Sequence, residues 1–120
     1  MKILIADDSR VMRQIVTRTL RQAGYEGHDL VEAADGRQAY DAVVAESPDL
    51  VLSDWNMPEL TGVEVLRKLR DGGNQVPFGF VTSESSEEMR RTAEAAGALF
   101  LITKPFTADS FRDALDPILG

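Results

Sequence analysis

The chain has 120 residues, of which 43% are hydrophobic and 28% charged, so we expect one domain over residues 1–120 with a single core. It contains no cysteine, which excludes disulfide bonds and thiolate metal sites. The formal net charge of −7 argues against nucleic-acid binding, and with no long apolar run or signal sequence we expect a cytoplasmic protein without membrane contact.

Short apolar segments alternate along the chain with segments of helical periodicity. The strand-like segments are residues 2–6, 29–33, 49–53, 78–82 and 99–103. Three of them are almost continuously apolar, as is typical of parallel strands covered on both faces, whereas the second is more polar and is expected nearer an edge. Gly79 inside the fourth segment predicts the close approach of a helix.

The first two helices are expected at residues 10–23 and between Asp35 and Pro48. Gly24 is typical of a helix end, and Asp35 is typical of a residue that caps a helix start. Side chains at helical spacing should face the core, namely Val11, Ile15, Val16 and Leu20 in the first helix and Ala39, Val43 and Val44 in the second.

The last three helices carry their own boundary signals. Thr61 with Glu64, and Ser85 with Glu88, have the spacing of a capping box, in which two residues exchange side-chain-to-backbone hydrogen bonds. Three further residues mark boundaries: Gly97 at the end of the fourth helix, Thr107 at the start of the fifth, and Pro117, which should terminate or bend the fifth.

Five strand–helix units with short connections predict a doubly wound α/β fold, (βα)5, with helices on both faces of a parallel sheet. The carboxyl ends of such strands open into one crevice. Polar side chains follow four of the five strands there: Asp7 and Asp8 after the first, Asp54 after the third, Thr82 at the end of the fourth and Lys104 after the fifth.

Three carboxylates in one crevice require a counter-charge, because two unit charges about 4 Å apart repel by about 4 kcal/mol at an effective dielectric of roughly 20. Carboxylate oxygens, a backbone carbonyl and water are ligands for a hard divalent cation such as Mg²⁺. Lys104 and Thr82 could contact phosphoryl oxygens, and a central carboxylate can accept a phosphoryl group covalently. Asp54 is central and is therefore the expected acceptor.

Simpler interpretations exist for each residue taken alone. Asp7 and Asp8 could be solvated loop acids, and Lys104 could be a surface lysine. Two other functions remain alternatives: a magnesium phosphatase with an aspartyl-phosphate intermediate, and a flavodoxin-like cofactor-binding module. The phosphatase would need an acid where this chain has Asn56, and the module would need a phosphate-binding loop after the first strand.

Four motifs resemble those of receiver domains of two-component response regulators, in particular the stand-alone chemotaxis (CheY-like) regulators. They are ADDSRVMR at 6–13, SDWNMPELTGVEVLRKLR at 53–70, VTSES at 81–85 and AAGALFLITKPF at 95–106. The resemblance covers essentially the whole chain. It implies a flavodoxin-like sheet with strand order 2-1-3-4-5.

The resemblance also implies roles for the crevice residues. Asp54 would accept a phosphoryl group from a histidine kinase or a histidine phosphotransfer protein. Asp8, Asp54 and the Asn56 carbonyl would bind Mg²⁺ directly, and Asp7 would bind it through water. Thr82 and Lys104 would contact the phosphoryl oxygens.

The resemblance makes further predictions about backbone, output and tuning. Lys104–Pro105 would be a cis peptide, and Asn56 and Glu84 would tune hydrolysis of the phosphoaspartate. A monomer would contact its protein target through the fourth helix, fifth strand and fifth helix. A phosphate sink, or a receiver fragment of a larger regulator, remains an alternative.

Two features depart from the family pattern. Leu101 stands three residues before Lys104, where these proteins usually carry an aromatic residue that turns inward when the threonine moves. Phe100 is adjacent, but in a strand it should face the other side of the sheet. The segment before the second strand also predicts a larger loop.

Overall fold

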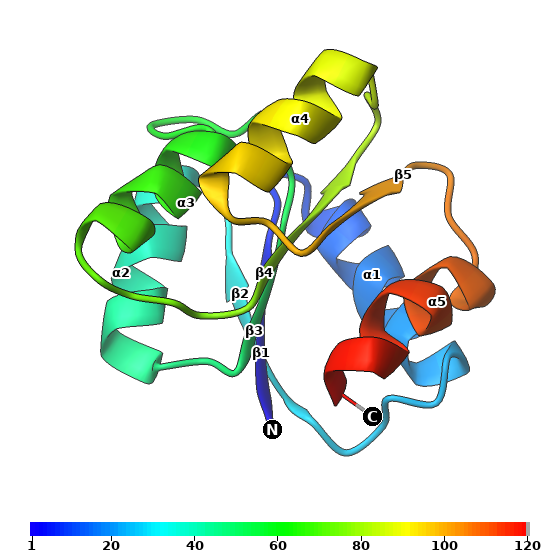
Figure 1. Ribbon diagram of the computed structural model, residues 1–120. Coiled ribbons are helices and arrows are strands. Elements are labelled where there is room, and N and C mark those ends of the chain that lie inside the picture. Colours follow the sequence, from blue (N-terminus) through cyan, green and yellow to red (C-terminus); the bar gives the residue numbers. More distant parts are fainter. Residues whose placement is uncertain (120) are drawn as a thin grey trace.

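A single parallel sheet organises the fold. The computed structural model describes residues 1–119 and places five parallel strands in the order β2-β1-β3-β4-β5 (Figure 1). This confirms the predicted doubly wound fold and strand order, with the more polar second strand at an edge. The strands are β1 (Lys2–Ala6), β2 (Asp29–Ala33), β3 (Leu50–Ser53), β4 (Phe78–Thr82) and β5 (Phe100–Thr103).

Helices cover both faces of this sheet (Figure 1). One face carries α1 (Arg10–Gln22) and α5 (Ala108–Leu119); the other carries α2 (Gly36–Glu46), α3 (Gly62–Asp71) and α4 (Glu87–Ala96). No helix within residues 1–119 is long and apolar enough to cross a membrane.

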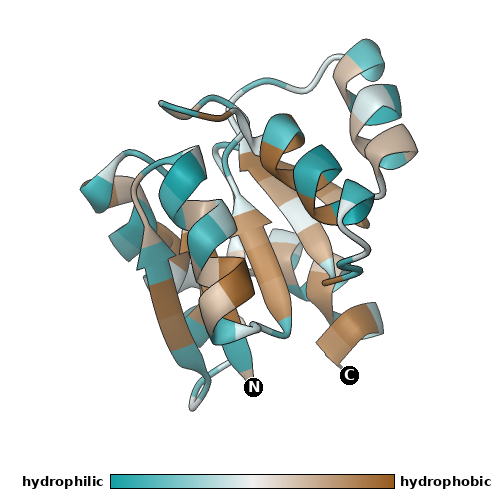
Figure 2. Cartoon of the chain, turned by 90° about the vertical axis from the view of Figure 1, so that its left-hand side faces the viewer, coloured by the Kyte–Doolittle hydropathy of each residue, from teal (hydrophilic) through white to brown (hydrophobic). Residues whose placement is uncertain are grey.

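Each strand supplies side chains to two apolar layers, because successive residues point to opposite faces. In β1, Leu4 and Ala6 pack with α2 and α3, whereas Ile3 and Ile5 pack with α1 and α5. Figure 2 shows the result, with apolar strands inside and polar stretches along the helices. Burial of each large apolar side chain stabilises the fold by about 1.5–3 kcal/mol.

Helix caps agree with the sequence at two of the three positions where a capping residue was predicted. Asp35 caps α2 by accepting a 2.7 Å hydrogen bond from the Gln38 amide. Thr61 and Glu64 form the predicted capping box at α3. The prediction for α4 is wrong by one residue, because Ser86 rather than Ser85 accepts from the Met89 amide.

Three side chains predicted to face the core do not. Val11 is 63% exposed, Ile15 36% and Val44 60%. In α1, Val16 and Leu20 are buried as predicted, together with Thr19, so the buried face of the helix is turned away from Val11 and Ile15. Val44 follows the buried Val43, and one residue turns the side chain by about 100° around a helix.

Two backbone predictions also need correction. The group that approaches Gly79 most closely is not part of a helix; it is the ring of Phe100, the partner residue of Gly79 in β5. A Cβ atom at position 79 would lie 2.1 Å from that ring. Pro117, which was expected to terminate or bend α5, does not terminate it, because the helix continues to Leu119. A proline in the last turn removes one helix hydrogen bond but leaves few residues beyond it to destabilise.

Candidate functional site

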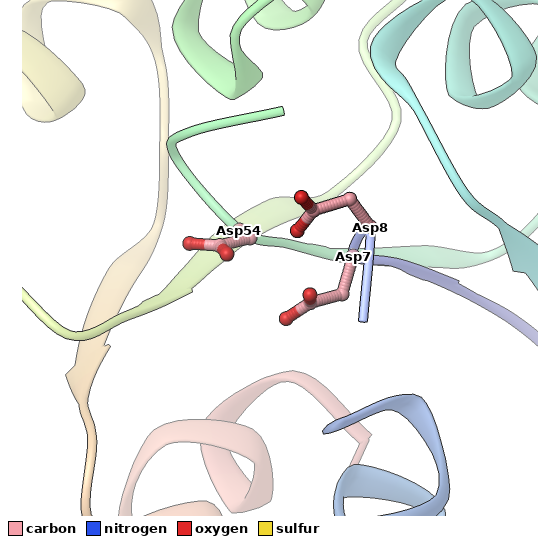
Figure 3. A group of neighbouring side chains, drawn as sticks. All are labelled: Asp7, Asp8 and Asp54. Carbon is pink, nitrogen blue, oxygen red and sulfur yellow. The ribbon is translucent and has the colours of Figure 1, made fainter. Parts of the chain in front are cut away.

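Three aspartates lie together at the carboxyl ends of β1 and β3. Ala6 pairs with Ser53 in the sheet, so the residues that follow, Asp7 and Asp54, leave the two strands side by side. One carboxylate oxygen from each of Asp7, Asp8 and Asp54 lies within 4.8 Å of the others (Figure 3). Asp7 is buried, Asp54 half-buried and Asp8 exposed. The structure therefore brings together the three carboxylates that the sequence predicted to meet.

Lys104 supplies a positive charge to this cluster. Its Nζ atom lies 3.1 Å from Oδ2 of Asp7 and 3.4 Å from Oδ2 of Asp54. The end of β5 positions it, because the Lys104 amide donates to the Thr82 carbonyl at 2.8 Å. The Lys104–Pro105 peptide bond is cis, as predicted.

The environment of Asp54 opposes its ionisation. Burial raises the pKa of its carboxyl group, the charge of Lys104 lowers that pKa, and the neighbouring Asp7 raises it again, with burial the largest effect. Oδ1 accepts a 2.7 Å hydrogen bond from the Trp55 amide, whereas Oδ2 faces Lys104. The two oxygens therefore have different surroundings.

Thr82 lies at the end of β4 and is fully buried. Its hydroxyl oxygen accepts from the Glu84 amide at 3.4 Å, and within residues 1–119 it makes no hydrogen bond to the aspartates. The structure places this residue at the predicted edge of the sheet but without a hydrogen bond to the carboxylates.

A hollow of about 310 Å³ opens beside Asp8. Asn56, which is exposed, lines it with Met57, Pro58 and Thr61. The loop that carries Asn56 is tied at its base, because the Gly62 amide donates to the Trp55 carbonyl at 2.7 Å. Asp8 and Asn56 therefore share one open space next to the cluster.

Leu101 and Phe100 lie on opposite faces of β5, as predicted. Leu101 packs with the layer beneath α2, α3 and α4, and Phe100 packs with the layer beneath α1 and α5. Phe100 therefore does not occupy the place of the usual aromatic residue.

The structure also shows a residue that the sequence did not single out. Arg13 of α1 donates through Nη1 to the backbone carbonyl of Asp7 at 2.6 Å. Arg13 is the last residue of the ADDSRVMR motif at 6–13, but nothing in that motif assigned its side chain a partner. Only the angle of α1 to the sheet brings the two together.

The donor atoms of this cluster fit a hard divalent cation. Three carboxylates face a single lysine, which leaves two negative charges without a partner if all three are ionised. All available ligands are oxygen atoms, and a half-open site leaves room for water. This combination suits Mg²⁺ better than zinc.

The fold and this cluster define an α/β protein with an acidic site at the point where the strand order reverses. The sequence profile described as "Response regulator receiver domain" matches residues 3–116. The chain belongs to the receiver domain family of response regulators, and its curated relatives include chemotaxis proteins of the CheY type.

These relatives match over nearly their full length. The chain is 37% identical over 123 residues to chemotaxis protein CheY1 of Helicobacter pylori, covering 100% of this chain and 98% of that protein. It is 38% identical over 120 residues to chemotaxis protein CheY-3 of Vibrio cholerae, covering 98% and 91%. The solved structure of CheY4 from Vibrio cholerae superposes with a TM-score of 0.84 at 34% identity, covering 98% and 97%.

Proposed function

We propose that this receiver domain is a phosphorylation-controlled switch in which Asp54 accepts a phosphoryl group. The donor is the phosphohistidine of a histidine kinase or of a histidine phosphotransfer protein. The observation that supports this proposal most strongly is the convergence of Asp7, Asp8, Asp54 and Lys104 at one edge of the sheet.

The chemistry of the transfer follows from the surroundings of Asp54. Its Oδ1 atom is held by the Trp55 amide, so Oδ2, which faces Lys104, is the nucleophile. A new O–P bond forms, the P–N bond to the donor imidazole breaks, and the imidazole keeps the electron pair. Lys104 stabilises negative charge on the phosphoryl oxygens, and transfer of this kind depends mainly on positioning and charge.

Mg²⁺ would be held by Asp8, Asp54 and the Asn56 carbonyl, with Asp7 contributing through water. When bound, the ion neutralises charge on the carboxylates and on the phosphoryl oxygens. Lys104 already offsets one carboxylate charge, and Asp7 keeps Lys104 close to the acceptor.

Thr82 couples the modified aspartate to the surface. Its hydroxyl moves toward the phosphoryl group and carries the start of α4 with it. The face made by α4, β5 and α5 then changes its contacts with a downstream protein. A hollow of about 250 Å³ already lies on this face, lined by Arg90, Ala93, Glu94, Ala98, Leu99, Phe100 and Leu101.

Mass spectrometry tests the proposal. Incubation with Mg²⁺ and acetyl phosphate should add the mass of one phosphoryl group, and hydroxylamine should remove it because it cleaves acyl phosphates. Asp54→Asn should abolish the added mass, with Asp41→Asn on α2 as an exposed control. Modification that persists in Asp54→Asn would end the assignment of Asp54. Multiple turnover of phosphate esters would favour a phosphatase.

A further inference from the structure

Asp8 is the least constrained member of the acidic cluster. Its side chain is exposed and, within residues 1–119, makes no hydrogen bond or ion pair. Asp7 is held by its Oδ1 atom, which accepts from the Ser9 amide at 2.9 Å, and by Oδ2, which lies near Lys104. No side-chain contact among the described residues holds the Asp8 carboxylate, so its placement depends on the direction in which the backbone projects the Cβ atom.

The peptide group that joins Asp7 to Asp8 lies just beyond the hydrogen-bonded ladder of the sheet. The Asp7 amide donates to the Ala33 carbonyl at 3.0 Å, which is the last rung between β1 and β2. Because β2 ends at Ala33, the ladder supplies no donor for the Asp7 carbonyl. Arg13 provides that donor at 2.6 Å. A peptide group is planar, so holding its oxygen also sets the direction in which Asp8 leaves the strand.

Arg13 is itself anchored. Its Nε atom donates to Oε1 of Glu32 at 2.8 Å, and its side chain is only 13% exposed. The guanidinium group therefore links the edge strand β2 to the loop that carries Asp8. A rigid group with donors in a fixed plane suits such a bridge better than a lysine ammonium group.

We propose that Arg13 is a positioning residue for the Mg²⁺ site: it holds the Asp7–Asp8 peptide so that the Asp8 carboxylate points into the cluster. This inference rests on the proposed function, since it assigns Asp8 to the ion. Arg13 acts through the backbone and touches neither the ion nor the phosphoryl group. Residues that orient metal ligands typically change metal affinity by about 10–100-fold when replaced.

Whether replacement of Arg13 weakens or tightens Mg²⁺ binding distinguishes a positioning role from a purely electrostatic one. Removal of a positive charge beside an anionic site should by itself tighten Mg²⁺ binding, because the site becomes more negative. Loss of positioning should weaken binding instead. Arg18 offers a matched control, since it lies on the same helix, is exposed and makes no ion pair within residues 1–119.

The experiment is a Mg²⁺ titration of the full chain, followed by the fluorescence of Trp55, the only tryptophan, whose amide contacts Asp54. We expect Arg13→Met to raise the half-saturating Mg²⁺ concentration about tenfold, and Arg18→Met to leave it unchanged or lower it slightly. Arg13→Lys should recover part of the loss. At saturating Mg²⁺, phosphorylation of Arg13→Met by acetyl phosphate should return to near the wild-type rate.

Other results overturn the inference. Equal affinities for Arg13→Met and Arg18→Met, or tighter binding by both, would show that Arg13 acts only through its charge. If circular dichroism shows that Arg13→Met does not fold, Arg13→Lys is tested in its place. A Mg²⁺ affinity of Arg13→Lys equal to that of the wild type would likewise show that Arg13 acts only through its charge. A wild-type chain that neither binds Mg²⁺ nor becomes phosphorylated would instead contradict the proposed function.

Discussion

Asp54 combines burial with a charged function. Burial is the largest influence on its carboxyl group and raises its pKa, although Lys104 opposes this rise. An acid whose pKa is higher in the folded state holds its proton more tightly there. Its ionisation therefore destabilises the fold, and the stability present in the protonated form is lost as the pH rises through the folded-state pKa.

Replacement of Asp54 by asparagine should therefore stabilise the metal-free protein at neutral pH, by about 1 kcal/mol. The difference from wild type should shrink as the pH falls, and should vanish below the ordinary aspartate pKa of about 3.9, where both side chains are neutral. Urea unfolding of both proteins in the presence of EDTA, from neutral pH down to acidic pH, measures this difference in the free energy of unfolding. A less stable Asp54→Asn at neutral pH would show that the attraction of Lys104 outweighs burial.

Gly62 fixes the loop that follows Asp54. A Cβ atom at position 62 would lie 2.2 Å from the Asp54 carbonyl oxygen and 2.8 Å from the ring of Phe80, which is fully buried. Gly62→Ala should therefore destabilise the protein by about 1–3 kcal/mol, the usual cost of overpacking. Gly72→Ala is the control, because its nearest neighbours would lie at 3.6 Å. Urea unfolding that gives equal stabilities for the two variants would contradict this view of the loop.

The sequence predicted most of the site because strand ends meet at one edge of a parallel sheet. That argument needs only the order of the elements, and it placed Asp7, Asp8, Asp54 and Lys104 together. It could not show that the Thr82 hydroxyl would make no hydrogen bond to the three aspartates. Nor could it find Arg13, whose contact with a backbone carbonyl depends on the orientation of a whole helix.

At the scale of the element, the start of α4 is decided by a single serine. Ser86 accepts from the Met89 amide at 3.1 Å, whereas Ser85 lies before the cap. Ser86→Ala should lower the free energy of unfolding by about 1 kcal/mol, and Ser85→Ala should change it by less than about 0.5 kcal/mol. Chemical denaturation of both variants measures the difference. A larger loss in Ser85→Ala would place the cap where the sequence predicted it.

Helix positions were easier to predict from the sequence than helix rotations. Alternating apolar and amphipathic segments located all five helices and all five strands, with β3 and β5 starting one residue later than expected. Val11 and Ile15 fit a helical period but lie outside the buried face of α1. Periodicity alone cannot decide between two adjacent apolar stripes, because packing against the sheet and α5 determines which of them is buried.

For the whole molecule, the excess charge of the acidic cluster predicts a link between metal binding and stability. A ligand that binds only the folded state stabilises it by mass action. Mg²⁺ should therefore raise the thermal midpoint of the wild-type chain in proportion to the logarithm of its concentration, and should raise that of Asp8→Asn less. Thermal unfolding at constant ionic strength measures this. An equal rise in both proteins would indicate non-specific screening.

The central claim is that Asp54, and no other carboxylate, accepts the phosphoryl group with the help of Mg²⁺. Borohydride reduces an acyl phosphate to an alcohol, so it converts a phosphorylated aspartate into homoserine, which tandem mass spectrometry can locate. After treatment with acetyl phosphate and Mg²⁺, we expect homoserine at position 54 alone, and almost none when EDTA replaces Mg²⁺. Homoserine at position 7 or 8, or equal yields with and without Mg²⁺, would contradict the account.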